Sequence, residues 1–379
     1  PPPPPPPPPP PFFFQADEGI RDFCLSRGLG DVYKRQFLLI AYHLAWSFVS
    51  WSPYWFIPNN KNFDYLGLFM ELINTWRIPI LFLISGIAFR YSFANRKPKV
   101  LLIERLKVLG IPYVFGIFTF GSASLLLVTY FWNTKGESEI LWFPEDGHLW
   151  FLFNILLYSF IYLLFARKLS LFSKKNRLVT NLLKNRFGMF FFALPIVLEG
   201  YLLDSLPIWY GYNFYIAYMD TLHGLILGFL WFGIGIIMVS QEKDFWIALE
   251  YNWRFNLTLG IILYINRLLN DFQDINGALV AFESYNFIFF LLGISANFLN
   301  KSSSQLDYYK QAIFPVYIVH LPIQHVLMIW LGGWGINPLL KYFLILFLIC
   351  FCSLTFYHSI KNFKILRPLF GLRNPIKNK

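Results

Sequence analysis

The chain has 379 residues, of which 56% are hydrophobic, 21% aromatic and only 14% charged. A soluble domain usually carries about 25% charged residues, so this composition excludes an ordinary soluble enzyme. The formal net charge is +11, but the lysines and arginines form short clusters between apolar stretches. That pattern is typical of a membrane protein and argues against binding to nucleic acid.

Residues 1–36 do not resemble part of a fold. They begin with eleven prolines and continue as FFFQADEGIRDFCLSRGLGDVYKRQ, which shows neither helical periodicity nor an apolar run. We expect this segment to be disordered or artefactual.

From Phe37 onward the sequence predicts ten membrane-spanning helices, because about 20 apolar residues are needed to cross about 30 Å of hydrocarbon. The first and the seventh are the shortest. The expected spans are 37–52, 67–91, 108–132, 148–166, 187–206, 220–239, 255–268, 284–300, 311–332 and 338–357. We therefore expect an all-α, polytopic membrane domain over residues 37–360, followed by a basic tail at 361–379.

The connections between the predicted spans alternate in charge. The basic ones contain Arg90, Arg96, Lys97, Lys99, Arg105 and Lys107, then Arg167, Lys168, Lys174, Lys175, Arg177, Lys184 and Arg186, and then the lysines and arginines of the tail. The connections between them are acidic or nearly neutral, and Glu139 and Glu283 fall in two of these. Basic connections stay in the cytoplasm, so both termini are predicted to be cytoplasmic.

Three ionisable residues, His43, Arg77 and His320, lie near the middle of separate predicted spans. An unpaired charge in hydrocarbon costs on the order of 3 kcal/mol or more, so such residues usually mark a functional path. At 1.5 Å per residue, each lies about 14 to 15 Å along its helix, which is mid-membrane depth. We predict one catalytic site in which His43 or His320 is the general base and Arg77 stabilises negative charge. The alternative is that each is satisfied separately by a nearby carbonyl or hydroxyl group.

Further polar and aromatic residues are expected near the outer mouth of the bundle. His148 and Trp150 begin the fourth predicted span, and Glu199 lies inside the fifth. Tyr317 shares a helix face with His320, where its hydroxyl could orient the imidazole or relay a proton, or its ring could serve only for packing. We predict that His148, Trp150, Glu199 and Tyr317 bind substrate. The rings and carboxylates at the rim suit a sugar, although they equally suit an interfacial belt.

The three cysteines predict neither a metal site nor a disulfide framework. Cys350 and Cys352 lie inside an apolar stretch, where a free cysteine acts as a small hydrophobic residue, and Cys24 lies in the N-terminal segment.

Five segments occur in an order and spacing that resemble the acyltransferase 3 membrane family, in particular its branch of glucans biosynthesis protein C type succinyltransferases. They are TWRIPILFLISGIAFRYSF (75–93), RLKVLGIPYVFG (105–116), GHLWFLFNILLYS (147–159), FPVYIVHLPI (314–323) and LRPLFGLR (366–373). The resemblance implies about ten transmembrane helices in the inner (cell) membrane and a cytoplasmic acyl-CoA donor. It also implies transfer of an acetyl or succinyl group to a hydroxyl of an extracytoplasmic glycan, with no tightly bound cofactor and no metal.

The resemblance also implies roles for individual residues. It makes His43 a catalytic candidate and places a basic residue eleven positions earlier, where this chain has Val32 with Lys34 and Arg35 nearby. It further implies a pair of basic residues before the third span for the phosphates of CoA. Arg105 fits this pair, and Lys107 lies beside the second position, which is Val108.

Two other classes of function remain open from the sequence. A transporter or flippase of a polar or anionic solute would also carry ionisable residues at mid-membrane depth. A non-catalytic membrane scaffold would explain the apolar helices but not the buried histidines and arginine. The expected partners of an acyltransferase are acyl-CoA, a carbohydrate acceptor and membrane lipids, and no oligomeric state is implied.

Overall fold

The computed structural model describes residues 32–94, 96–165, 176–185, 187–205, 218–272, 276–298 and 304–372. The side chains of residues 32–36, 304–307 and 310 are not included in that description. Most of the predicted N-terminal segment, part of the second basic connection and the end of the basic tail lie outside the described residues. So do the side chains of Val32, Lys34 and Arg35.

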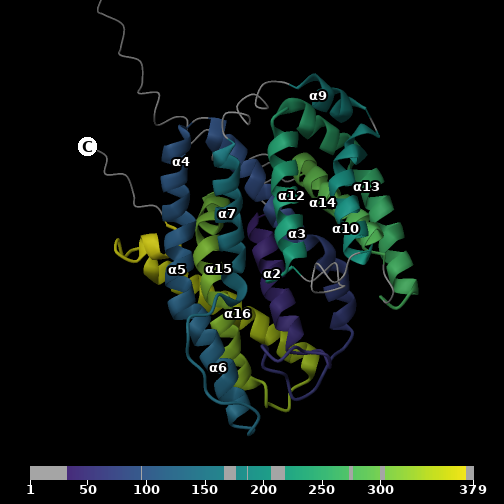
Figure 1. The fold of residues 1–379 in the computed structure, drawn as a ribbon. Coiled ribbons are helices and arrows are strands. Elements are labelled where there is room, and N and C mark those ends of the chain that lie inside the picture. The colour runs from purple at the N-terminus through teal and green to yellow at the C-terminus, as the bar shows by residue number, and fades with distance from the viewer. Residues whose placement is uncertain are drawn as a thin grey trace, which may run out of the picture.

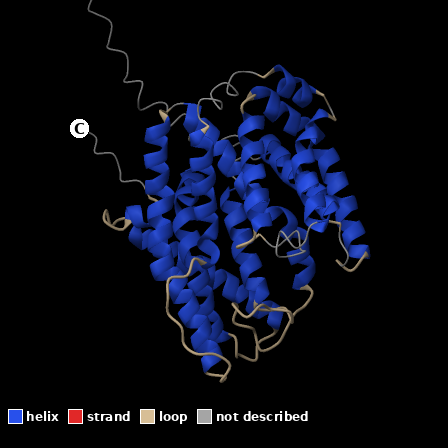
Figure 2. Cartoon of the chain, in the orientation of Figure 1, coloured by secondary structure: helices blue, strands red, loops and turns tan. Residues whose placement is uncertain are grey.

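Helices are the only regular elements in the part of the chain that the structure describes, which confirms the predicted all-α class (Figures 1 and 2). The α-helices are α2 (Val32–Trp46), α3 (Leu66–Ala94), α4 (Pro98–Arg105), α5 (Ile111–Gly116), α6 (Ser122–Asn133), α7 (Trp150–Leu164), α9 (Arg177–Lys184), α10 (Leu194–Ser205), α12 (Leu222–Val239), α13 (Lys243–Leu269), α14 (Gly277–Phe298), α15 (Ser304–Leu331) and α16 (Pro338–Ile360).

Eight helical stretches among the described residues are long and apolar enough to cross a membrane. The chain is therefore a multi-pass membrane protein, and these stretches correspond to eight of the ten predicted spans. The predicted first span is the shorter helix α2, whose apolar part is Phe37–Trp46. The predicted seventh span is the second half of α13, which begins already at Lys243.

The predicted start of the eighth span is wrong. Helix α14 begins at Gly277, not at residue 284, so Glu283 lies inside a helix and not in an outer connection. Its side chain is buried, and a buried carboxylate needs a charged or hydrogen-bonding partner.

The third span is longer than a membrane requires. Helical backbone runs without a break from Pro98 to Asn133, with two π-helical turns, and 36 residues reach about 54 Å. The chain then returns along α6, so that the amide of Glu145 donates to the carbonyl oxygen of Ile117 at 3.3 Å. A Cβ on Gly121 would lie 1.7 Å from the Glu145 carbonyl oxygen, so only glycine fits there. Helix α7 therefore starts deep inside the bundle.

The connections segregate to two ends of the bundle. Figure 1 shows α9 and the start of α4 at one end and the end of α6 at the other. At the α6 end, the Trp132 indole N–H donates to the carbonyl oxygen of Tyr54 at 2.9 Å. The basic connection that precedes α4 and the acidic connection that follows α6 thus lie at opposite ends, as the charge alternation predicts.

The orientation of these ends can be tested by labelling with a membrane-impermeant maleimide. In a variant with the native cysteines replaced by alanine, Glu139→Cys should react from outside the cell, because its connection is acidic. Lys184→Cys on α9 should react only after the membrane is opened, because positive residues stay in the cytoplasm. The opposite pattern would reverse the predicted orientation.

Candidate functional site

Four residues from three parts of the chain form a buried group that we call the histidine cluster: His43, His148, Tyr317 and His320. His43 Nδ1 lies 3.0 Å from His320 Nε2, and the two rings stack with centroids 5.2 Å apart. The His148 ring centroid lies 4.9 Å from that of His320 and 6.5 Å from that of His43. The structure thus brings together two residues predicted to be catalytic and two predicted to bind substrate.

The backbone of Tyr317 fixes the ring orientations in the cluster. Its carbonyl oxygen lies 2.7 Å from His320 Nδ1 and 2.8 Å from His148 Nε2. A carbonyl oxygen only accepts hydrogen bonds, so both of these nitrogens carry the hydrogen. The Tyr317 hydroxyl in turn donates to the carbonyl oxygen of His148. These bonds lock α15 to the turn that precedes α7.

The hydrogen on His320 Nδ1 determines the direction of its contact with His43. In a neutral imidazole the other nitrogen is an acceptor, so His320 Nε2 accepts a hydrogen bond from His43 Nδ1. The lone pair of His43 is then on Nε2. His320 is 0% exposed, whereas His43 is partly exposed. His43 is therefore the member of this pair that a substrate can reach.

Local sequence explains how α15 and α2 present these side chains. Pro315 and Pro322 lie on either side of the Tyr317–His320 turn, and each removes a backbone donor from the helix. The Gln324 side-chain amide donates to the carbonyl oxygen of His43 at 3.0 Å, which ties the two helices together.

Arg77 lies next to the histidine cluster but not inside it. Its guanidinium Cζ is 3.5 Å from the ring centroid of Tyr42, the residue before His43. Its Nε and Nη2 donate to Asn74 Oδ1 at 3.3 and 3.2 Å. No carboxylate of the described residues pairs with Arg77, and its side chain is partly exposed. The partners given for its positive charge are thus uncharged: the Tyr42 side chain and an amide oxygen.

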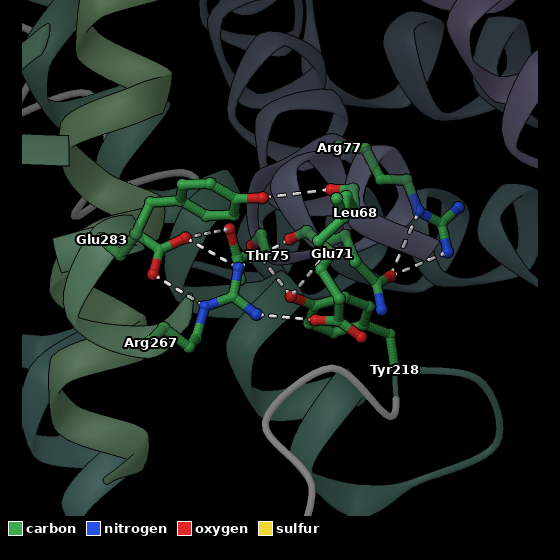
Figure 3. Close-up of polar contacts among 9 residues, drawn as sticks. Leu68, Glu71, Thr75, Arg77, Tyr218, Arg267 and Glu283 are labelled. Carbon is green, nitrogen blue, oxygen red and sulfur yellow. Dashed lines mark hydrogen bonds and ion pairs between the residues drawn. The ribbon is translucent and has the colours of Figure 1, made fainter. Parts of the chain in front are cut away.

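A second arginine, Arg267 of α13, differs from Arg77 because its partners are carboxylates (Figure 3). Its Nε and Nη2 donate to the two carboxylate oxygens of Glu283 at 2.9 and 3.0 Å. Its Nη1 donates to a carboxylate oxygen of Glu71 at 2.7 Å, and its Nη2 donates to the Glu71 carbonyl oxygen at 2.6 Å. Figure 3 shows Arg77 pointing away from this group. Arg267 therefore joins α3, α13 and α14 in a network that the sequence pattern does not predict.

Glu199, predicted to bind substrate, instead pairs with a histidine. Its Oε1 lies 2.5 Å from His223 Nδ1, and both side chains are buried. The His223 ring stacks on Tyr218, whose hydroxyl donates to the Thr75 carbonyl oxygen at 2.9 Å. This pair joins α10 to α12 and, through Tyr218, to α3.

The other predicted site residues have partners outside the histidine cluster. Trp150 is buried at the start of α7, with its ring 6.2 Å from that of Phe82. The Arg105 guanidinium lies 5.6 Å from the Phe89 ring centroid, and Lys107 is exposed.

The comparisons with known proteins give one match. Residues 37–358 match the model of a family described as an acyltransferase domain. This range contains the histidine cluster, Arg77 and the Arg267 network. The comparisons with curated proteins and with solved structures found no match. The glucans biosynthesis protein C branch thus stays a prediction.

An acidic residue beside the cluster has an altered proton affinity. Asp146 ends the connection that leads to His148, and burial, helped by the nearby Asp220 and Glu145 carboxylates, raises its pKa from 3.8 to about 6. The folded state therefore binds this proton more tightly than the unfolded chain. The contribution of Asp146 to the free energy of unfolding should therefore fall as pH rises from 3.8 to about 6 and then stay constant.

The Asp146→Asn variant tests this pH dependence. Because asparagine carries no charge, the variant should melt on the order of 2 °C higher than the parent at pH 7.5. The two proteins should melt together at pH 3.5, where Asp146 is protonated in both states. Thermal unfolding in detergent measures both values, and an equal difference at the two pH values would contradict the raised pKa.

The Arg267→Met variant tests the buried ion network. It leaves Glu283 and Glu71 without their cation, which should lower the free energy of unfolding by about 3–5 kcal/mol. Arg254→Met is the matched control, because Arg254 lies on the same helix but is exposed. It should change stability by about 0.5 kcal/mol or less. Equal melting temperatures for the two variants would show that the network contributes no stability.

Proposed function

Because the chain belongs to the acyltransferase domain family and is a membrane acyltransferase, we propose that it acylates an extracytoplasmic glycan. The acyl group, acetyl or succinyl, would come from cytoplasmic acyl-CoA and pass to a hydroxyl of the glycan. The observation that supports this most directly is the hydrogen-bonded chain from His43 through His320 to the Tyr317 carbonyl oxygen.

In this proposal His43 is the general base. Its Nε2 takes the proton from the acceptor hydroxyl while the hydroxyl oxygen attacks the thioester carbonyl carbon. The carbon–sulfur bond then breaks, and the proton passes from His43 to the departing thiolate. General base catalysis of this kind typically accelerates a reaction by about 10²- to 10⁴-fold.

His320 is a positioning residue in the same proposal. It is fully buried, and its Nε2 accepts from His43 Nδ1, which orients the imidazole and stabilises the positive charge that develops on it. His148 and Tyr317 hold His320 in place and do not contact the reacting atoms. Of the two histidines that the sequence offers as the general base, the proposal therefore assigns this role to His43.

Arg77 is the electrostatic stabiliser in this proposal. Among the described residues it has no carboxylate partner, so its charge is available to an oxyanion or to an acyl carboxylate. Arg105 and Lys107 are proposed to bind the phosphates of CoA. They lie near the start of the long helical stretch that begins at Pro98, next to the basic connection that we predict to be cytoplasmic. Glu199 pairs with His223 and Trp150 packs against Phe82, so the proposal gives these two residues no role in the chemistry.

Three histidine variants test the assignment, compared for yield, melting temperature and acyl transfer. The assay incubates purified protein with radiolabelled acetyl-CoA or succinyl-CoA and a periplasmic glycan extract. His43→Ala should lower turnover by about 10²-fold or more while folding normally. His320→Gln should retain more activity than His320→Leu, because the Gln amide oxygen can still accept from His43 Nδ1.

The matched control is His358→Ala, which changes an exposed histidine near the end of α16 and should leave activity unchanged. A folded His43→Ala protein with full transfer activity would refute the proposed base. Uptake of a solute into vesicles without release of CoA would favour the transporter instead.

A further inference from the structure

The segment that follows α2 folds back over its outer end, and we call residues 47–63 the outer cover. The amide of Asn59 donates to the Ser47 carbonyl oxygen at 2.6 Å, and the amide of Phe63 donates to the Phe48 carbonyl oxygen at 2.6 Å. These two bonds close the segment into a compact loop, so its middle stays close to α2.

The middle of the outer cover lies directly against the proposed base. The Phe56 ring centroid is 6.1 Å from the ring of His43, and it stacks on Trp46 at 6.2 Å. On its other side it lies 6.3 Å from the ring of His325, which is itself buried. Phe56 therefore places an apolar ring between His43 and the outer end of the bundle.

A buried lysine holds the outer cover in place. Lys341 lies in the first turn of α16 and is 0% exposed. Its ammonium nitrogen lies 2.8 Å from Asn59 Oδ1 and 2.9 Å from Asn60 Oδ1, both in the cover. It also lies 2.9 Å from the Gly332 carbonyl oxygen and 2.6 Å from that of Trp334, in the turn between α15 and α16.

All four oxygens around Lys341 are uncharged, so the burial of its charge is offset only by hydrogen bonds. A fully buried lysine of this kind is rare, and its removal would leave the side-chain oxygens of Asn59 and Asn60 without their donor. The Asn60 side-chain amide adds bonds to the carbonyl oxygens of Gly333 and Trp334 at 3.1 and 3.2 Å. The tie between the cover and the α15–α16 turn thus rests on Lys341 and Asn60.

We propose that Lys341 is a positioning residue that keeps the outer cover closed over His43 and so keeps water from the acyl thioester. This inference rests on the proposed function of His43 as the base. With the cover loose, water can take the place of the acceptor. Its oxygen then bonds to the acyl carbon, the carbon–sulfur bond breaks, and its proton passes through His43 to the thiolate. The products are a free carboxylic acid and CoA.

The position of the cover can be measured without any enzyme activity. Ser47 is fully buried, so a Ser47→Cys reporter, with the three native cysteines replaced by alanine, should react slowly with a soluble maleimide. Adding Lys341→Met should raise the labelling rate about tenfold or more, because the cover then opens more often. Lys61→Met is the matched control, since Lys61 lies in the cover but is exposed, and it should leave the rate unchanged.

An unchanged labelling rate in the Lys341→Met protein would overturn the inference. If that protein does not fold, the Asn60→Ala variant is measured instead. This change removes one of the four oxygens around Lys341 and the two hydrogen bonds that the Asn60 amide donates, while Lys341 keeps its other three acceptors. It should raise the labelling rate in the same direction but by less, and an unchanged rate would again overturn the inference.

A second readout connects the cover to the reaction. The ratio of acyl-CoA hydrolysis to glycan acylation should rise about tenfold in Lys341→Met and stay constant in Lys61→Met. A raised labelling rate with an unchanged ratio would refute the water-excluding role while leaving Lys341 as the anchor. A wrong assignment of His43 as the base would give a different result. It would appear as full activity of the His43→Ala variant and would not alter the labelling rate.

Discussion

Polar side chains inside an apolar bundle must find partners within the protein, and this requirement organises the structure. Arg267 meets it with two carboxylates, and Lys341 meets it with four uncharged oxygens. Arg77 and His43 meet it only in part, since each keeps some exposure and has neutral partners. The buried side chains whose polar atoms are all paired hold helices together. The side chains whose polar atoms are only partly paired are those available to a substrate.

The two histidine pairs of the bundle show how a partner changes what an imidazole can do. His223 faces the carboxylate of Glu199 in a fully buried pair, which suits a fixed link between helices. His43 faces a neutral ring whose own position is set by a backbone carbonyl oxygen. In our proposal this neutral partner leaves His43 uncharged until it takes a proton, and then stabilises the cation by a hydrogen bond.

Apolar length predicted most of the fold, and depth along the helices predicted part of the site. Depth groups His43, Arg77 and His320, and the ring nitrogens of the two histidines do lie in hydrogen-bond contact, whereas Arg77 lies beside them against Tyr42. The sequence predicts His148 at the outer mouth only if each span starts at the membrane surface, whereas α7 begins deep in the bundle. A charge normally ends an apolar window, so the sequence predicts Glu283 in a loop. Its partner Arg267, which allows it to lie inside a helix, is 16 residues away in sequence.

The same deep start of α7 bears on how two substrates would meet at one base. His148 reaches the cluster on a connection that returns along α6, and Phe56 reaches His43 on the outer cover. Both approaches come from the α6 end of the bundle, where loops and not whole helices border the cluster. In the proposed reaction a glycan at that end needs only these loops to move. In the same proposal the acyl-CoA would instead extend its chain between helices from the other end. In this proposal the barrier between the two substrates would consist of loops on one side and packed helices on the other. The loops would then be the part that opens for the acceptor and closes before transfer in each turnover.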